Sequence, residues 1–186
     1  MDVANKNRIT TYLKQVIAVL DSMPLHEIGQ VVDALLDARR RGARVFIFGN
    51  GGSAATASHF ACDLGKGAAS PDQDRFKVVA LTDNVPLITA WANDTAYDNV
   101  FAEQLTNLME AGDVVIGISA SGNSPNVLRA LDLARRVGCT TIGFTGFDGG
   151  DLKGLADICV VVPSQHMGQV EDAHVVLVHL ITSCLA

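Results

Sequence analysis

Residues 44–64, RVFIFGNGGSAATASHFACDL, contain the pattern that decides the fold of this chain. The first six are mainly β-branched or aromatic and end in glycine, which predicts a short, buried strand of a parallel sheet. The glycines that follow predict a tight turn, and the turn leads into a helix for which Ser53 is a candidate cap. Strand, glycine turn and helix in this order indicate the first half of a βαβ unit.

The same alternation of strand and helix continues to the end of the chain. Because crossover helices between parallel strands cover both faces of a sheet, the pattern predicts an α/β fold with a doubly wound, five-stranded parallel sheet. The chain closes with a helix over 170–186. The expected strands cover residues 44–49, 76–81, 113–119, 140–146 and 157–163.

Two further helices, over 8–22 and 26–41, precede the first strand, and Gly42 ends the second of them. Neither helix has a strand partner, so we expect them to pack on the edge of the sheet or on another subunit. The sequence contains no linker or internal repeat. We therefore expect a single domain over 1–186, made of a helical extension (1–42) and an α/β core (43–186).

Composition narrows the class of protein further. The 186 residues are 48% hydrophobic and 18% charged, which excludes an intrinsically disordered chain. The formal net charge is −6 with no run of lysine or arginine, which argues against nucleic acids and membrane surfaces as partners but leaves a small anionic ligand open.

Neither a signal core nor an apolar run of about 20 residues is present, so we expect a cytoplasmic protein. The cysteines form no CxxC pair, and in that compartment they predict free thiols rather than disulfides. We expect these thiols to be buried. They are Cys62, Cys139, Cys159 and Cys184.

Two loops rich in glycine and serine, residues 49–53 and 119–124, each follow a strand and open a helix. Ligands of α/β sheets bind at the carboxyl ends of the strands, and the free N–H groups of a helix N-terminus suit a phosphate. Hydroxyls and amides could wrap that phosphate without lysine or arginine. The alternative is that both loops are ordinary turns with capping serines.

Of two known nucleotide-binding motifs, one is absent from the sequence and the other is matched only weakly. The sequence lacks GxxxxGK[ST], which excludes a nucleoside-triphosphate loop. Residues 49–54 match the dinucleotide fingerprint GxGxxA, but that fingerprint needs an acidic residue about 20 positions further on. The first acid after the second expected strand is Asp83, which lies too far along the chain.

Histidines and carboxylates recur at helical spacing in two places. His59 and Asp63 are four residues apart and share one helix face. On the closing helix, Glu171 and His179 also share a side, whereas His174 lies about 140° around the helix from His179. Two histidines with two carboxylates suit tetrahedral zinc or another divalent ion. A surface ion pair between His59 and Asp63 is the alternative.

Asn93 and Asp94 end the segment AWAND. The Asp94 carboxylate either caps a helix end or accepts hydrogen bonds from sugar hydroxyls, and the residues alone leave both readings open. We expect Trp91 in the same segment to belong to the core.

These motifs carry a resemblance that extends over nearly the whole chain. The segments GNGGSAATASHFACDL, LTDNVPLITAWAND, GISASGNSPNV and VEDAHVVLVH are similar, in order, to the successive motifs of the sugar isomerase (SIS) domain family. Within that family the chain resembles the phosphoheptose isomerases. The resemblance implies a homotetramer with active sites at subunit interfaces. It also implies isomerisation of sedoheptulose 7-phosphate to D-glycero-D-manno-heptose 7-phosphate through an enediol.

The resemblance also implies one zinc ion per subunit and a set of site residues. Asp63 and His179 are implied to move protons. The implied metal ligands are His59, Asp63, Glu171 and His179. Substrate contacts, with the phosphate on the three serines of the second loop, are implied for Asn50, Gly51, Gly52, Ser53, Asp63, Asn93, Asp94, Ser119, Ala120, Ser121, Ser124 and Glu171.

Three positions depart from the residues usual in the family. Asp63 stands where glutamate is typical, Glu171 where glutamine is typical, and Gly67 where arginine is typical. Because Glu171 supplies a carboxylate that glutamine lacks, we predict that it shares the role of catalytic base. The departures leave two alternatives open: an isomerase for another long sugar phosphate, such as an octulose 8-phosphate, or a non-catalytic regulator that binds a sugar phosphate or a replication initiator.

Overall fold

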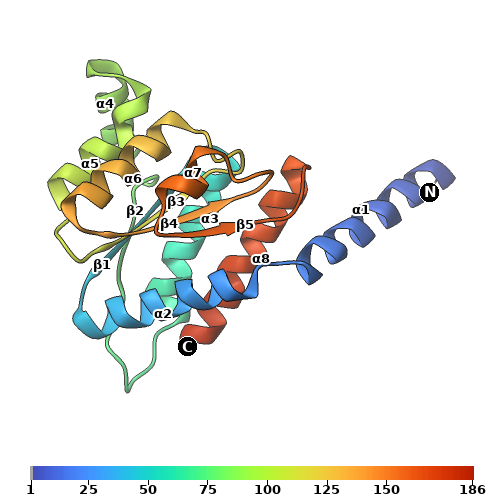
Figure 1. The fold of residues 1–186 in the computed structure, drawn as a ribbon, viewed down its shortest axis with the longest axis horizontal. Helices are drawn as coiled ribbons and strands as arrows, with labels where there is room; N and C mark the ends of the chain where they lie inside the picture. The colour runs from blue at the N-terminus through green and yellow to red at the C-terminus, as the bar shows by residue number, and fades with distance from the viewer. Residues whose placement is uncertain (1) are drawn as a thin grey trace.

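A computed structural model describes residues 2–186, which form one parallel sheet with helices on both faces (Figure 1). The strand order is β2-β1-β3-β4-β5, and every neighbouring pair is parallel. The predicted α/β class and all five predicted strands are confirmed. The strands are β1 (Arg44–Gly49), β2 (Lys77–Ala80), β3 (Val114–Ile118), β4 (Thr140–Thr145) and β5 (Ile158–Val161).

The helix predicted over 26–41 is confirmed to within one residue, but the one predicted over 8–22 begins at Val3, five residues early, and the closing helix begins at Met167, three residues early. Gly42 and Gly138 end α2 and α6 in the left-handed conformation, with φ of +67° and +92°, which other residues rarely adopt. The α-helices are α1 (Val3–Asp21), α2 (Leu25–Arg41), α3 (Gly52–Cys62), α4 (Val85–Asp94), α5 (Val100–Leu108), α6 (Pro125–Val137), α7 (Gly150–Leu155) and α8 (Met167–Leu185). The π-helical turn η1 (Asp63–Gly67) and the 3₁₀ turn η2 (Tyr97–Asn99) complete the helical elements.

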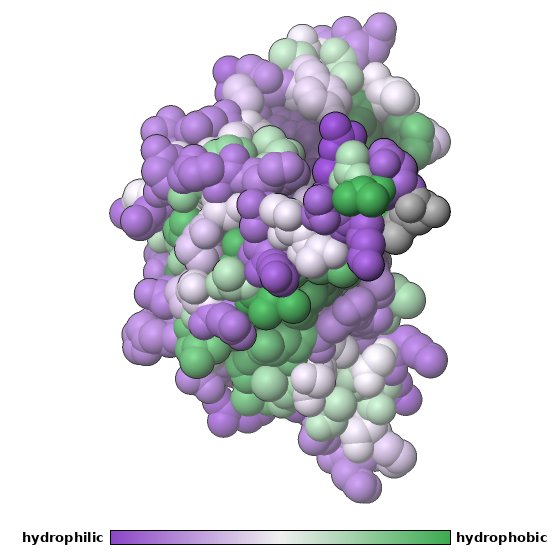
Figure 2. Space-filling model, turned by 90° about the vertical axis from the view of Figure 1, so that its right-hand side faces the viewer, coloured by the Kyte–Doolittle hydropathy of each residue, from purple (hydrophilic) through white to green (hydrophobic). Residues whose placement is uncertain are grey.

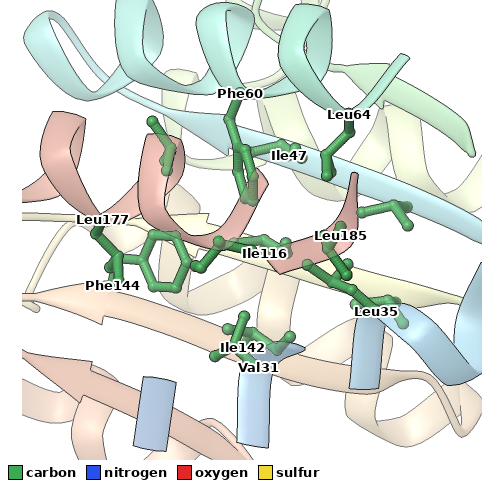
Figure 3. Close-up of a cluster of buried hydrophobic side chains, with 14 of the residues drawn as sticks. Val31, Leu35, Ile47, Phe60, Leu64, Ile116, Ile142, Phe144, Leu177 and Leu185 are labelled. Atoms are coloured by element: carbon green, nitrogen blue, oxygen red, sulfur yellow. The ribbon is translucent and has the colours of Figure 1, made fainter. Parts of the chain in front are cut away.

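The hydrophobic core lies in two layers, one on each face of the sheet. Helices α2, α3 and α8 cover one face, where Phe60 of α3 and Phe144 of β4 pack with ring centroids 6.3 Å apart beside Leu177 of α8 (Figure 3). Helices α5 and α6 cover the other face, with Phe101 stacked on Phe48 of β1. Burying each such large side chain contributes about 1.5–3 kcal/mol, so the sheet is held firmly from both sides.

The order of the strands places the two glycine and serine loops side by side. Strands β1 and β3 are neighbours whose last residues, Gly49 and Ile118, pair in register. The chain leaves β1 toward one face of the sheet and β3 toward the other, because α3 and α6 cover opposite faces. This reversal is the topological switch point at which ligands of open α/β sheets bind.

Several local expectations need correction. Helix α2 packs on a face of the sheet, with Val31 and Leu35 fully buried in the core, and not on the sheet edge. Ser53 is not a cap, because α3 begins at Gly52 and Ser53 is buried inside its first turn. The cysteines are free as expected, but only Cys139 is buried. Cys159 is half-buried, and Cys62 and Cys184 are exposed, because they lie on the outer sides of α3 and α8.

Candidate active site

A cleft of about 340 Å³ lies at the switch point, between the loops that follow β1 and β3. Residues from both loops and from the start of α8 line it, and the lining contains no lysine or arginine among the described residues. The lining residues are Asn50, Gly51, Gly52, Ser53, Ile118, Ser119, Ala120, Ser121, Ser124, Met167 and Glu171. The tertiary structure therefore brings together all eight loop residues that the sequence analysis singled out.

The second loop is built to hold hydroxyls toward the cleft. The hydroxyls of Ser119 and Ser124 lie 2.9 Å apart, and Ser124 is the residue that precedes α6. Gly122 allows the loop its tight course, because its φ is +70° and a Cβ there would lie 2.0 Å from the carbonyl oxygen of Gly149. The hydroxyls beside the N-termini of α3 and α6, called the serine cradle below, are chemically suited to hold an anion without help from a cationic side chain.

Three groups with metal-binding chemistry meet beside this cleft. His59 of α3, Asp63 of η1 and His179 of α8 place their ligand atoms within 4.8 Å of one another. His59 Nε2 and His179 Nε2 are 3.1 Å apart, and Asp63 Oδ2 lies 3.5 Å from the first and 3.7 Å from the second. The sequence predicted each helical pair, and the packing of α3 against α8 joins them.

The spacing of these three atoms fits a tetrahedral ion. Nitrogen and oxygen ligands lie about 2.0–2.2 Å from tetrahedral zinc, which puts neighbouring ligand atoms about 3.3–3.6 Å apart. The three distances of 3.1, 3.5 and 3.7 Å bracket that range. The donor set of two imidazoles and one carboxylate is also of the type that zinc takes.

Glu171 lies between the cradle and this group of three. It lines the first cleft and also a second cleft of about 260 Å³, which includes His59 and Asp172. Its Oε1 lies 2.7 Å from where a Cβ of Gly52 would be, so the absence of a side chain at Gly52 lets the carboxylate rest against the start of α3. Glu171 is not part of the group of three, and its predicted role as a fourth ligand stays a prediction.

Other predicted residues lie further away. Asn93 and Asp94 are exposed at the end of α4, where Asn93 Nδ2 donates to Asp94 Oδ1 at 2.8 Å, and neither lines the two clefts. His174 faces away from His179, as its position on the helix predicts. Its Nε2 donates to the carbonyl of Thr145 at 3.2 Å, and burial lowers its pKa to about 4.

Two residues at the site escaped the sequence analysis. Tyr97 of η2 and Asn126 of α6 both hydrogen-bond to the side chain of Asn50. Asn126 stands two residues after Ser124, in the first turn of the predicted helix. An asparagine at such a position is only a weak sequence signal of a role at the site. Nothing in the local sequence marks Tyr97, because its contact depends on how α4 and α5 pack.

Comparison with known proteins identifies the class that this fold and site define. The SIS-domain family matches residues 11–146, which is most of the chain. The chain belongs to this family.

Individual relatives narrow the assignment. A probable phosphoheptose isomerase of Thermoplasma acidophilum is 40% identical over 174 residues, which cover 94% of this chain and 95% of that relative. The phosphoheptose isomerase of Pelobacter propionicus is 39% identical over 178 residues, 93% of each chain. A solved phosphoheptose isomerase from Neisseria gonorrhoeae has a TM-score of 0.89 at 30% identity and covers 97% of both chains. Within the SIS family, the chain therefore belongs with the phosphoheptose isomerases, and it is an isomerase.

Within residues 2–186, no helix combines the length and the apolar character that crossing a membrane requires.

Proposed function

We propose that this isomerase converts sedoheptulose 7-phosphate to the aldose D-glycero-D-manno-heptose 7-phosphate. The observation that carries the proposal is the continuity of the two clefts, which share Gly52 and Glu171. A substrate whose phosphate occupies the serine cradle extends past Glu171 toward His59. The reacting end of a long sugar phosphate therefore reaches carboxylates and histidines while its anionic end is held by hydroxyls.

The reaction moves two protons, and the residues offer groups for both. A base removes the proton from C1 of the ketose, which gives a cis-enediol, and the proton is returned to C2 to form the aldose. A second proton leaves O1 and is added to O2. Asp63 and His179 are the pair that we assign to these transfers. Glu171 shares the role of base, because its carboxylate borders both clefts.

His59, Asp63 and His179 would hold one zinc ion, with Glu171 as the candidate fourth ligand. When bound, the ion would supply a Lewis acid for the negative charge that develops on the C1 and C2 oxygens. Two groups orient the sugar for proton transfer whether or not the ion is bound. They are the loops that hold the phosphate, and the carboxylate of Glu171.

We further propose a homotetramer in which neighbouring copies complete the site. Helix α1 projects from the body of the molecule, and Figure 2 views the side from which it projects, where hydrophobic side chains gather. Ile9, Leu13 and Ile17 form an apolar stripe on α1 and are each more than 50% exposed, at 52%, 57% and 59%. The side chains of His59 and His179 are also 46% and 53% exposed, which leaves the catalytic end open to another copy. A second copy would cover both surfaces.

Turnover tests the proposal directly. The purified protein is incubated with sedoheptulose 7-phosphate, with and without zinc, and NMR follows the appearance of an aldoheptose phosphate. Appearance of the aldose supports the proposal. Protection of the protein against heat without conversion points to a different sugar phosphate or to a regulatory binding domain. If the protein shows no conversion and the sugar phosphate gives no protection, the proposal is refuted.

A further inference from the structure

The side-chain amide of Asn50 is held by two residues that do not line the cleft. Asn50 Nδ2 donates to Asn126 Oδ1, and Asn126 Nδ2 donates to Asn50 Oδ1, both at 2.9 Å. The hydroxyl of Tyr97 donates to the same Asn50 Oδ1 at 3.0 Å. Asn126 is 2% exposed in the first turn of α6, whereas Tyr97 is 53% exposed on η2. Elements from three parts of the chain therefore converge on one amide.

A backbone group favours one direction for these hydrogen bonds. The N–H of Val127 donates to Asn126 Oδ1 at 3.0 Å and also to the carbonyl oxygen of Ser124 at 3.0 Å, and a backbone N–H cannot accept. With the oxygen of the Asn126 amide facing Val127, its nitrogen donates to Asn50 Oδ1. Rotating the amide of Asn50 by half a turn would set nitrogen against nitrogen and oxygen against oxygen. The orientation of Asn50 thus follows from the start of α6.

This arrangement leaves Asn50 with one unused polar group. Its Oδ1 accepts two hydrogen bonds, and one of its two Nδ2 hydrogens is donated to Asn126. Over residues 2–186, the other Nδ2 hydrogen has no partner within the chain, and Asn50 lines the cleft at the switch point. What Asn50 has left to offer a ligand is a donor, which suits a phosphate or carbonyl oxygen.

We propose that Asn126 and Tyr97 are positioning residues that lock the amide of Asn50 so that it presents an N–H to an acceptor oxygen of the substrate. The proposal rests on the proposed function, because the sugar phosphate supplies that oxygen. Neither Asn126 nor Tyr97 lines the cleft, so both act through Asn50.

A double-mutant cycle tests whether Tyr97 acts through Asn50. Tyr97→Phe removes only the hydroxyl, and we expect it to raise KM for sedoheptulose 7-phosphate by about 2- to 10-fold, the value of one hydrogen bond, with a smaller effect on kcat. In the Asn50→Ala background the same substitution should change KM by about 1.5-fold or less. An equal rise in KM in both backgrounds overturns the proposal.

A matched control removes another contact between the same two elements. Arg129 of α6 donates to Asn99 Oδ1 of η2 at 2.8 Å, and none of the side-chain hydrogen bonds of Asn50 within residues 2–186 involves Asn99. Asn99→Ala loosens η2 without reaching the amide, so we expect an unchanged KM. If Asn99→Ala raises KM as much as Tyr97→Phe does, then the effect is a general loosening of η2 and the proposal fails.

Asn126→Asp tests the buried partner. The substitution keeps an oxygen for the N–H of Val127 but sets a second oxygen against Asn50 Oδ1. We expect a rise in KM of about 10-fold or more, because the lock is replaced by repulsion. A folded Asn126→Asp protein with an unchanged KM overturns the proposal, and if this variant does not fold, the Tyr97 cycle still decides.

A measurement without substrate separates this inference from the proposed function. In ¹⁵N-labelled protein, the side-chain NH₂ signals of Asn50 are assigned by their disappearance in Asn50→Ala. We expect these signals to shift in Tyr97→Phe and to stay in place in Asn99→Ala. If the wild type turns over no sugar phosphate, then the proposed function fails, while these signals still decide the lock. Unshifted signals in Tyr97→Phe overturn it.

Discussion

Nε2 of His59 and Nε2 of His179 lie 3.1 Å apart, although 120 positions separate the two residues in the chain. Their rings meet edge to face, with centroids 4.7 Å apart and planes at 71°. Two ring nitrogens this close repel each other if both carry a proton or if both carry a lone pair, so they need a shared proton or a cation between them. Asp63 Oδ2 adds a negative charge 3.5 and 3.7 Å away.

This geometry predicts that zinc stabilises the folded protein. Zinc at about 100 times its Kd adds about 2.7 kcal/mol to the free energy of unfolding, which in a chain of this size raises Tm by about 5–10 °C. Differential scanning fluorimetry of metal-free protein, with and without zinc, measures the shift.

Two variants control this measurement. The combined substitution His59→Ala and His179→Ala removes both nitrogens and should abolish the shift. His26→Ala, at an exposed position on α2, should leave it intact. A zinc-dependent shift of the same size in the double variant would show that the ion binds elsewhere.

The second prediction concerns Glu171 as a base. Glu171→Gln keeps the size and shape of the side chain but cannot take a proton. General bases contribute about 10²–10⁴-fold, and because the role is shared with Asp63 and His179 we expect a loss of about 10²-fold in kcat. Steady-state turnover of sedoheptulose 7-phosphate provides the measurement, and unchanged turnover would refute the role.

The third prediction displaces the same carboxylate without changing it. In Gly52→Ala, the new Cβ would lie 2.7 Å from Glu171 Oε1, so the Glu171 side chain must move. We expect kcat to fall by about 10-fold or more, because catalytic groups act only in the correct geometry. Gly29→Ala on α2 is the matched control, since a Cβ there meets nothing within 4 Å. Equal kcat values for the two variants would contradict the role given to Glu171.

The fourth prediction is a loss of stability in mild acid that originates at His174. Burial lowers the pKa of His174 from 6.5 to about 4. The folded state therefore binds fewer protons than the unfolded chain between these values. The contribution of neutral His174 to the free energy of unfolding is fully present above about pH 6.5. It is lost as the pH falls toward 4, by up to about 3 kcal/mol.

Urea unfolding at several pH values measures this dependence. His174→Gln can still donate to the carbonyl of Thr145 and does not titrate, so the decline in the free energy of unfolding between pH 6.5 and 4 should flatten. His26→Gln, at an exposed position, should keep the wild-type decline. The same decline in both variants would assign the acid sensitivity to other groups.

The fifth prediction tests assembly through α1. Leu13 is 57% exposed in one chain, so Leu13→Glu should hardly change the stability of a monomer. A charge buried in an apolar interface would instead weaken the association between copies. We expect the variant to elute as a smaller species in size-exclusion chromatography with light scattering. Thr11→Glu adds the same charge to the opposite side of α1 and should leave the assembly unchanged. A Leu13→Glu protein of wild-type size would contradict the role of the stripe.

Local patterns were enough to predict the layers of this fold. Alternating buried strands and amphipathic helices produce one parallel sheet whichever way the helices pack, and terminal glycines such as Gly42 end helices for steric reasons that act within one turn. The burial of α2 was harder to predict, because its apolar face could fit the sheet, its edge or another subunit equally well. The exposed positions of Cys62 and Cys184 likewise depend on which side of each helix meets the sheet.

The sequence by itself determined the chemistry available at the site. Two local features follow directly from the order of residues. One is the hydroxyls and glycines at two strand ends, and the other is the histidines and carboxylates at helical spacing. Only the tertiary structure decided which of them meet. The 3.1 Å approach of His59 to His179, the contact of Glu171 with Gly52 and the hold of Asn126 and Tyr97 on Asn50 all join elements far apart in the chain. Such contacts are set by how helices pack across the sheet, which no local pattern records.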